Sequence, residues 1–446
     1  MQQPRSTNQQ LNKLIEFRQA LYQQGFPKRR DAQFELLDAL LLSPPIRSFP
    51  ELSLSPIFRR QWPSAYAAVE AGRQDAEWLR QFLGSQVPTQ GVQVFALDTS
   101  GWPRPSAPTL PDRQYVHRAS PGSGGNPTVI GYPYSELAWV AQGGSSWALP
   151  VDLERIPSSS DALAVGVAQV QKLCQRRGPP SGRLNLDVIT ADGGYGNHRF
   201  LQPLRDQPCG VLVRLRRDRV LYSDPPVYPG RGRPRIHGAS FAFKQPQTWG
   251  EPQQHHQFQD HHWGRVEIQY WSGLHARQAP AAPFGVLRVQ VRLDQRRPPQ
   301  ALWLGWQGPP WPAVALWRYY QRRWSIEPSF RWRKQQLYWT TPQFQSPEVA
   351  DRWSILVSLA QWVLFLASGV VADQPLPWQK AQQQLTPGRV QQGLAGLFQQ
   401  IGTPAQPPKT RGKPPGWPKG LARPRPARFP VARKGPPRAK SRGKAA

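Results

Sequence analysis

The chain has 446 residues, which is enough for about two or three domains of ordinary size. Its 57 Lys and Arg outweigh its 27 Asp and Glu and give a formal net charge of +30, so a polyanion is the expected partner and nucleic acid the first candidate. The 2 Cys are too few and too far apart for a disulfide framework or a zinc finger, and the 51 Pro and 37 Gly favour a folded protein with loop-rich insertions and tails.

Residues 1–90 are predicted to form a helical N-terminal domain, because apolar residues recur at helical spacing in 11–24 and 32–42. Basic residues such as Lys28 lie between these stretches, so DNA binding is one expected role and packing against the rest of the chain is the other. The first residues lack the apolar core of a signal peptide, and the expected location is the cytoplasm, in association with the nucleoid.

From about residue 91 the apolar pattern becomes that of short strands. Strands are predicted at 92–98, 128–132, 145–153, 184–192 and 210–216, with helices at 161–177 and 197–206. Strands in succession, followed by strands alternating with helices, predict an α/β fold with a mixed sheet flanked by helices. Residues 91–216 are therefore expected to form the first part of this α/β core.

Residues 217–310 show prolines, glycines and strand patterns alone, and they are predicted to be a β-rich insertion. Helix returns in 311–373, the second part of the core. Within it, residues 354–372 are almost long enough to span a membrane, but Gln361 and three serines favour a buried helix, and no membrane is expected as a partner.

No acidic residue follows Asp373, and residues 374–446 are predicted to be a mostly disordered, basic, Pro-rich tail. Its last part, 404–446, carries 13 Lys and Arg and 11 prolines. Such a segment buries little apolar surface, so we expect it to contact phosphates without reading sequence.

Two polar clusters fall in the predicted insertion. The sequence RGRPRIHG at 231–238 resembles a hook in which a flat Gly-Arg-Pro segment lies along the minor groove of AT-rich DNA, although a basic loop is the favoured interpretation. The sequence QHHQFQDHHW at 254–263 lacks the ligand spacing of known structural zinc sites, so a solvated loop is favoured over a zinc site.

The sequence YYQRRWSIEPSFRWRKQQL at 319–337 carries a single acid, Glu327, among many cations. On a continuous helix, Tyr320, Arg323, Glu327 and Lys334 would lie within an arc of about 60°. This spacing fits two interpretations. One is a ladder of salt bridges on a solvent-exposed helix surface, and the other is a metal-binding carboxylate beside cations that bind phosphate. Pro328 forbids one helical hydrogen bond, so the helix either kinks at Glu327 or begins there with Pro328 in its first turn.

Two distant acids favour the second interpretation. Asp98 and Asp192 each close a predicted apolar strand, and Asp192 is followed by two glycines that let backbone approach a ligand. Three carboxylates on rigid elements suit two Mg²⁺ ions, because hard cations prefer oxygen ligands and a metal pair supports phosphodiester chemistry. A capping or turn aspartate remains the commoner role for any one of them.

The run from Tyr320 through Arg323 and Glu327 to Lys334 resembles the YREK signature of DDE transposases of the insertion-sequence-four type. The stretches LDTSGWPRP at 97–105, ADGGYGN at 191–197 and SPEVADRWSILVSLA at 346–360 are also similar to that group. The resemblance covers roughly residues 90–372. It implies an RNase H-like mixed-sheet catalytic core with Asp98 and Asp192 on adjacent strands and Glu327 on a helix after a β-rich insertion.

The resemblance also implies roles for these residues. Asp98, Asp192 and Glu327 would be the catalytic, metal-binding triad for two Mg²⁺ ions, with Mn²⁺ as a substitute, and Tyr320, Arg323 and Lys334 would contact DNA. Similar enzymes act as dimers on paired transposon ends, where water attacks first and the freed 3′-hydroxyl then forms a hairpin before strand transfer. A tryptophan of the insertion holds a flipped base in such relatives, and the candidates here are Trp263, Trp271, Trp303 and Trp306.

The sequence therefore predicts a transposase that cuts and joins double-stranded DNA at transposon ends and target, as a homodimer in the DNA complex. Two other classes stay open. An RNase H-like nuclease or resolvase would hydrolyse DNA without joining it, and a non-enzymatic basic DNA-binding protein would carry no chemistry.

Overall fold

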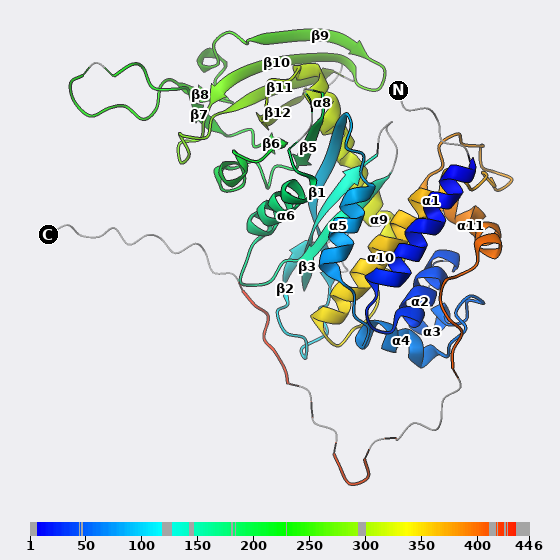
Figure 1. Cartoon of the computed structure of the whole chain (residues 1–446). Helices are drawn as coiled ribbons and strands as arrows, with labels where there is room; N and C mark the ends of the chain where they lie inside the picture. Colours follow the sequence, from blue (N-terminus) through cyan, green and yellow to red (C-terminus); the bar gives the residue numbers. More distant parts are fainter. Residues whose placement is uncertain are drawn as a thin grey trace.

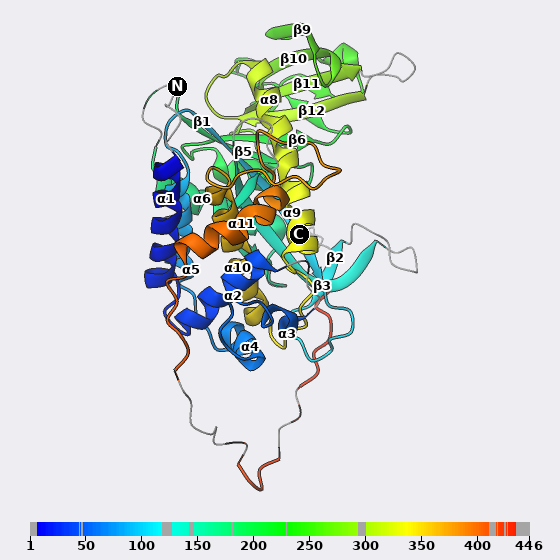
Figure 2. The same ribbon diagram turned by 90° about the vertical axis from the view of Figure 1, so that its right-hand side faces the viewer.

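The computed structural model describes residues 7–43, 45, 48–117, 127–141, 147–179, 182, 184–228, 230–292, 300–409, 416, 418–422, 425 and 427–433. A large mixed sheet runs through this part of the protein, helices cover both of its faces, and further helices gather at one end (Figures 1 and 2). The strands of this sheet are β1 (Val92–Pro103), β2 (Gln114–His117), β3 (Thr128–Val140), β4 (Ala148–Arg155), β5 (Leu186–Ala191), β6 (Gly210–Leu215), β9 (Gln254–Asp260), β10 (Gly264–Leu274), β11 (Phe284–Arg292) and β12 (Gln300–Gln307).

A separate hairpin is formed by β7 (Val220–Tyr222) and β8 (Ser240–Ala242). The helices are α1 (Thr7–Ala20), α2 (Arg30–Leu42), α3 (Phe49–Leu52), α4 (Trp62–Glu70), α5 (Ala76–Gln86), α6 (Ala162–Arg177), α7 (His198–Leu201), α8 (Ala313–Arg322), α9 (Ile326–Gln336), α10 (Pro347–Ala367) and α11 (Pro387–Ile401). Shorter turns of other helix types are η1 (Leu21–Gly25), η2 (Gln202–Leu204), η3 (Pro246–Thr248) and η4 (Arg323–Ser325).

The centre of the sheet has the order β4-β3-β1-β5-β6. Strand β1 pairs antiparallel with β3 and parallel with β5, and β5 pairs parallel with β6. The sequence prediction of a mixed α/β sheet is therefore confirmed. Asp98 and Asp192 lie beside each other at the point where the parallel pairing of β1 and β5 ends.

The side chains of β5 show how the two faces of the central sheet are covered. Leu186 and Val188 pack in a cluster with Leu316 of α8, whereas Ile189 and Ala191 belong to the cluster that contains residues of α6. Alternation along the strand thus buries both faces, as expected for parallel strands between two helical layers. The face toward α8 is the one that carries the candidate site.

Strand β1 differs from its prediction, because it does not close at Asp98. Its parallel pairing with β5 ends at Leu97, but its antiparallel pairing with β3 continues to Pro103. The apolar run in the sequence marks only the part of β1 that is covered on both sides. Beyond Asp98 the strand has a neighbour on one side and leaves the other side open.

The stretch 217–310, predicted as a β-rich insertion, contains strands β7–β12, and four of them extend the central sheet. Strand β12 pairs with β6, and β11, β10 and β9 follow it in antiparallel order. Residues 254–260, interpreted from the sequence as part of a solvated loop, form the edge strand β9 instead. Its histidines are exposed, which is why its composition did not resemble a strand.

Helices α8 and α9 are not one continuous helix. The 3-10 turn η4 separates them, and α9 begins at Ile326 with Pro328 in its first turn. In the first turn a proline removes no helical hydrogen bond, because the first backbone N–H groups of a helix have no partner within it. Of the two alternatives for Pro328, the structure therefore shows a helix that begins beside Glu327, at Ile326, with Pro328 in its first turn, rather than a helix kinked at Glu327.

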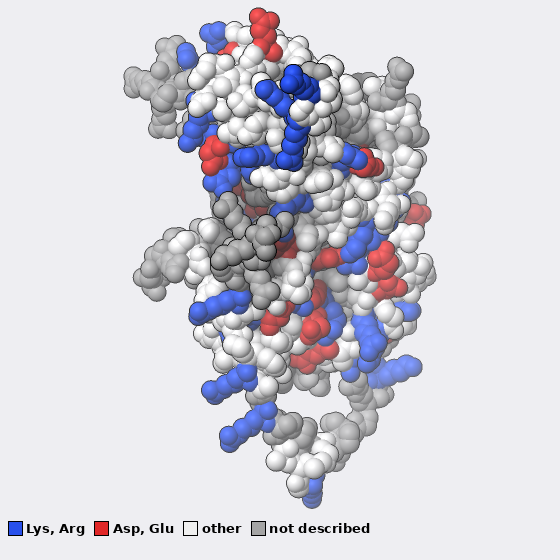
Figure 3. Space-filling model, turned by 90° about the vertical axis from the view of Figure 1, so that its left-hand side faces the viewer, with Lys and Arg blue, Asp and Glu red and all other residues white. Residues whose placement is uncertain are grey.

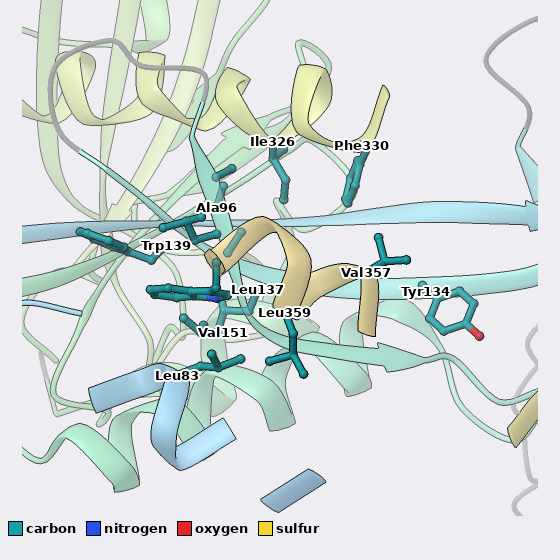
Figure 4. Close-up of a cluster of buried hydrophobic side chains, with 14 of the residues drawn as sticks. Leu83, Ala96, Tyr134, Leu137, Trp139, Val151, Ile326, Phe330, Val357 and Leu359 are labelled. Carbon is teal, nitrogen blue, oxygen red and sulfur yellow. The ribbon is translucent and has the colours of Figure 1, made fainter. Parts of the chain in front are cut away.

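Helix α10 lies at the centre of the helical layer. By length and composition it could cross a membrane, but 78% of its most apolar window is buried inside the protein, as the sequence predicted for a core helix. Figure 4 shows Val357 and Leu359 of this helix within the apolar cluster that joins the sheet to α9. The labelled neighbours from the sheet and from α9 are Ala96, Tyr134, Leu137, Trp139, Val151, Ile326 and Phe330.

The N-terminal helices pack against α10, with α1 and α2 in direct contact with it (Figures 1 and 2). Helix α11 also contacts both α2 and α10, so part of the predicted disordered segment 374–446 is folded. Arg18 of α1 joins these elements through Asp38, at 2.6 Å, and lies over the ring of Phe398 at 4.2 Å. The prediction of disorder was wrong for α11, because its apolar residues bury against the N-terminal helices.

Candidate active site

Asp98 and Asp192 lie at matching positions on neighbouring strands. The parallel register pairs Leu97 with Ala191, and the two acids are the next residues along β1 and after β5. Leu97 points toward Gly166 of α6, so Asp98 lies on the opposite face, which α8 and α9 cover. The backbone N–H of Thr99 donates to Asp98 Oδ1 at 2.8 Å.

The turn after β5 fixes the second acid. Gly194 N donates to Asp192 Oδ1 at 2.8 Å, and a side chain at position 194 would approach the carboxylate. The glycine therefore lets the turn fold back over the acid, which agrees with the role expected for the glycines that follow Asp192.

Glu327 reaches the same place from α9. The Arg323 guanidinium connects it to the sheet, because Nη2 donates to Glu327 Oε1 at 2.9 Å and Nη1 lies 3.4 Å from Asp98 Oδ2. The side chain of Glu327 is 45% exposed and that of Asp98 18% exposed, so both acids remain accessible to a ligand.

One open cleft of about 760 Å³ contains Asp98, Asp192, Arg323 and Glu327. A second cleft of about 820 Å³ shares Asp98 and Glu327 and extends along the other side to Lys334. The structure thus brings the three predicted acids together, although more than two hundred residues separate the first from the last along the chain.

The electrostatics of Asp98 reflect this crowding. The pKa of Asp98 is raised to about 6, mainly by burial. The Thr99 N–H and the Arg323 guanidinium oppose this rise, and the nearby Asp192 and Glu327 carboxylates add to it. Three carboxylates whose negative charges repel each other are the donor set that a hard divalent cation would stabilise.

The three carboxylates have the donor chemistry that a metal ion needs, but they do not form an assembled metal site in this structure. Among the described residues, no group of three or more His, Cys, Asp or Glu lies close enough together to hold a metal ion. Arg323 lies between two of the acids and supplies the positive charge there. The donor types fit Mg²⁺, and the three acids line one cleft.

The other two predicted DNA-binding residues have different surroundings. Tyr320 is only 8% exposed, and its ring lies 5.8 Å below the Arg323 guanidinium, where it supports the position of that cation. Lys334 lines the second cleft, and its Nζ donates to Gly101 O at 3.0 Å. Contacts of either residue with DNA stay predictions.

A buried ion pair that the sequence analysis missed holds α9 on the sheet. Arg333 Nη2 lies 2.5 Å from Glu136 Oε2, and both side chains are fully buried. Glu136 pairs across the sheet with Asp98, so this anchor lies directly beside the candidate site. Nothing in the local sequence distinguishes Arg333 from the cations around it, because its partner lies in a distant strand.

Four cations that were not predicted from the sequence also line the first cleft. Arg214, Arg216, Arg217 and Lys244 line it together with the three acids. They come from the end of β6 and from the residues that flank the β7–β8 hairpin. The alternation in the sequence VRLRR at 213–217 was the available signal, since it puts an exposed arginine on each second position.

An exposed tryptophan lies beside Glu327. Trp324 is 61% exposed, whereas the insertion tryptophans Trp271, Trp303 and Trp306 are each less than 5% exposed. Of the four candidates for holding a base, Trp263, at 38%, is the one with a substantial exposed surface. Trp324 is therefore a large apolar side chain left in solvent on the turn that precedes Glu327.

Residues 21–277 match the family model of the DDE superfamily endonucleases, and the chain belongs to that family. No curated protein matches the chain. The match includes Asp98 and Asp192 and ends before Glu327, so the family supports a nuclease or transposase enzyme with DNA as substrate. The assignment of the third acid depends on the geometry described above.

Proposed function

We propose that the protein is a transposase of the insertion-sequence-four type that cleaves DNA at the ends of its element and joins it to a target. The single observation that carries this proposal is the convergence of Asp98, Asp192 and Glu327 on one cleft in a DDE superfamily endonuclease. The sheet order β4-β3-β1-β5-β6 supports an RNase H-like core, with the first two acids on adjacent strands.

Each residue of the site has a proposed role. The three acids would hold two Mg²⁺ ions, which would activate the attacking oxygen and neutralise the leaving oxygen of the phosphodiester. Arg323 would exchange its bonds to Asp98 and Glu327 for a DNA phosphate, because its bidentate guanidinium suits phosphate as well as carboxylate. Lys334 would hold a second phosphate from the adjoining cleft.

The hairpin step is also part of the proposal. Trp324 is placed to stack on a base that leaves the duplex, since it is exposed and lies three residues before Glu327. Trp263 is the alternative from the insertion. A homodimer on paired ends, DNA binding by the N-terminal helices and a location at the nucleoid complete the proposal.

The test uses the purified full chain, Mg²⁺ and duplexes that carry the DNA flanking the reading frame. Asp98→Asn, Asp192→Asn and Glu327→Gln should each reduce cleavage by about a thousandfold or more, because the site loses several kcal/mol of charge stabilisation, while DNA binding is retained. Asp218→Asn is the matched control, since Asp218 lines the same cleft and is not one of the three.

The products decide between the classes of enzyme. Nicks followed by hairpins and strand-transfer products support the transposase. Nicks alone would favour a nuclease or resolvase, and full cleavage by all three acid variants would show that the cleft is not the active site.

A further inference from the structure

The loop between β7 and β8, described at residues 223–228 and 230–239, reaches beyond the sheet as an extended arm (Figure 1). We call it the β7–β8 arm. Its base is firmly held: Tyr222 and His275 exchange backbone hydrogen bonds of 2.9 Å, and His237 Nδ1 lies 3.0 Å from Nε2 of the fully buried His275. Gly238 donates to Ser223 O at 2.9 Å, where no side chain would fit.

The outer part of the arm presents three arginines to solvent. Arg231, Arg233 and Arg235 are exposed, and in the described residues none of the three forms an ion pair with an acid. Gly230 and Gly232 have φ values of 79° and 83°, which only glycine adopts without strain. The outer segment 230–236 therefore combines two glycines with three guanidinium groups, and its other side chains are Pro234 and Ile236.

The root of the arm belongs to the wall of the acid-lined cleft. Arg216 and Arg217 precede β7, Lys244 follows β8, and all three line the cleft that contains Asp98, Asp192 and Glu327. Lys and Arg side chains also gather on the upper part of the face shown in Figure 3. A polyanion bound in the cleft would therefore pass the root of the arm on its way out of the cleft.

We infer that the β7–β8 arm lies in the minor groove of the duplex beside the cleavage position and favours A·T-rich sequence there. The inference rests on the proposed function only in taking DNA as the ligand of the cleft. A helix or a two-stranded ribbon fits the major groove, whereas a thin extended segment with arginines fits the narrow minor groove of A·T tracts. Those grooves concentrate negative potential, which attracts guanidinium groups.

The experiment measures binding of the full chain to three duplexes of equal length without divalent metal. One duplex is A·T-rich, one is G·C-rich, and one replaces each guanine by inosine, which removes the amino group from the minor groove but leaves the major-groove acceptors. The wild type should bind the A·T and inosine duplexes about tenfold more tightly than the G·C duplex. The variant R231A/R233A/R235A should lose this preference.

A matched control removes three cations from the tail, in R425A/R428A/R433A. That variant should bind all three duplexes more weakly and keep the preference, because contacts to phosphates carry no sequence information. The inference is overturned if the arm variant keeps the preference, or if the wild type binds the inosine duplex as weakly as the G·C duplex. Circular dichroism checks that the arm variant is folded.

This outcome is independent of the proposed transposase activity. A protein that shows the arm-dependent preference but does not cleave DNA with Mg²⁺ would leave the inference standing and contradict the proposed function. A protein that cleaves DNA but shows no preference would support the proposed function and contradict the inference about the arm.

Discussion

Arg323 and Lys334 each line one of the acid-lined clefts, and their surroundings differ. Arg323 is held between Asp98 and Glu327, so its positive charge is neutralised before any ligand arrives. Lys334 has a backbone carbonyl as its hydrogen-bond acceptor instead. Burial, with the nearby Arg333 charge, lowers the pKa of Lys334 to about 8. Its charge is therefore the one that changes near neutral pH.

This pKa predicts a pH dependence of DNA binding. Lys334 is charged below about pH 8 and loses its proton above it, so the affinity that it contributes should fall between about pH 7 and pH 9. The variant Lys334→Arg stays charged over that range. Fluorescence anisotropy should show the wild type losing affinity about threefold more than the variant. Equal losses would show that Lys334 does not contact DNA.

The lowered pKa of Lys334 makes the stability of the fold respond to rising pH in the opposite direction from DNA binding. The folded-state pKa lies below the unfolded value, so between about pH 8 and pH 10.5 the unfolded chain binds more protons. The contribution of Lys334 to the free energy of unfolding should therefore rise with pH over that window. Stability and DNA binding thus respond to this residue in opposite directions.

Helix α9 contributes two of the predicted functional residues, Glu327 near its start and Lys334 near its end. Its attachment to the sheet depends on Arg333 and Glu136, together with the rings of Phe330 and Trp339 that lie 5.3 and 4.7 Å from the guanidinium. Loss of this anchor would displace both functional residues.

Arg333→Met should lower the free energy of unfolding by about 3–5 kcal/mol, because it leaves the Glu136 carboxylate buried without its partner. Urea denaturation measures the change. Arg176→Met is the control, since it removes a pair with the exposed Glu77 and should cost about 1 kcal/mol or less. Similar losses for the two variants would refute the role of the anchor. Adding Glu136→Gln to Arg333→Met should restore part of the stability.

The sequence predicted the elements whose signals are local. The spacing of Tyr320, Arg323 and Glu327 reflects helical turns that follow one another from α8 through η4 into α9. The apolar runs before Asp98 and Asp192 reflect strands buried on both faces. These patterns depend only on neighbouring residues, so the strands and the helical segment could be predicted from them. The convergence of the acids was implied by the resemblance to DDE transposases.

Other features depend on distant partners or were obscured by composition. The Glu136–Arg333 pair joins residues 197 positions apart, and nothing in either local sequence marks it. Helix α11 did have a signal, because Val390, Leu394 and Phe398 recur at helical spacing, but the surrounding prolines and cations favoured disorder. The length of β1 was underestimated because only its doubly covered part is apolar.

At the scale of the whole molecule, the basic tail and the folded body are joined more closely than composition suggests. Ala405 is 4% exposed, and its carbonyl accepts from Arg59 at 2.6 Å, so the folded part extends past residue 404. Further along, Phe429 N donates to Pro108 O at 2.6 Å, and Ala432 lines the cleft that contains Lys334. The tail therefore passes beside the proposed path of DNA.

A truncation that removes residues 410–446 keeps the contact of Ala405 and deletes 12 Lys and Arg. Each tail cation that contacts a phosphate releases a counterion and adds about 0.9 to the slope of log affinity against log salt. The magnitude of that slope should therefore fall by about 2 or more on truncation, measured with a nonspecific duplex over a series of salt concentrations. An unchanged slope would mean that the tail does not touch DNA, and the net charge of +30 would then act on DNA mainly through the folded body.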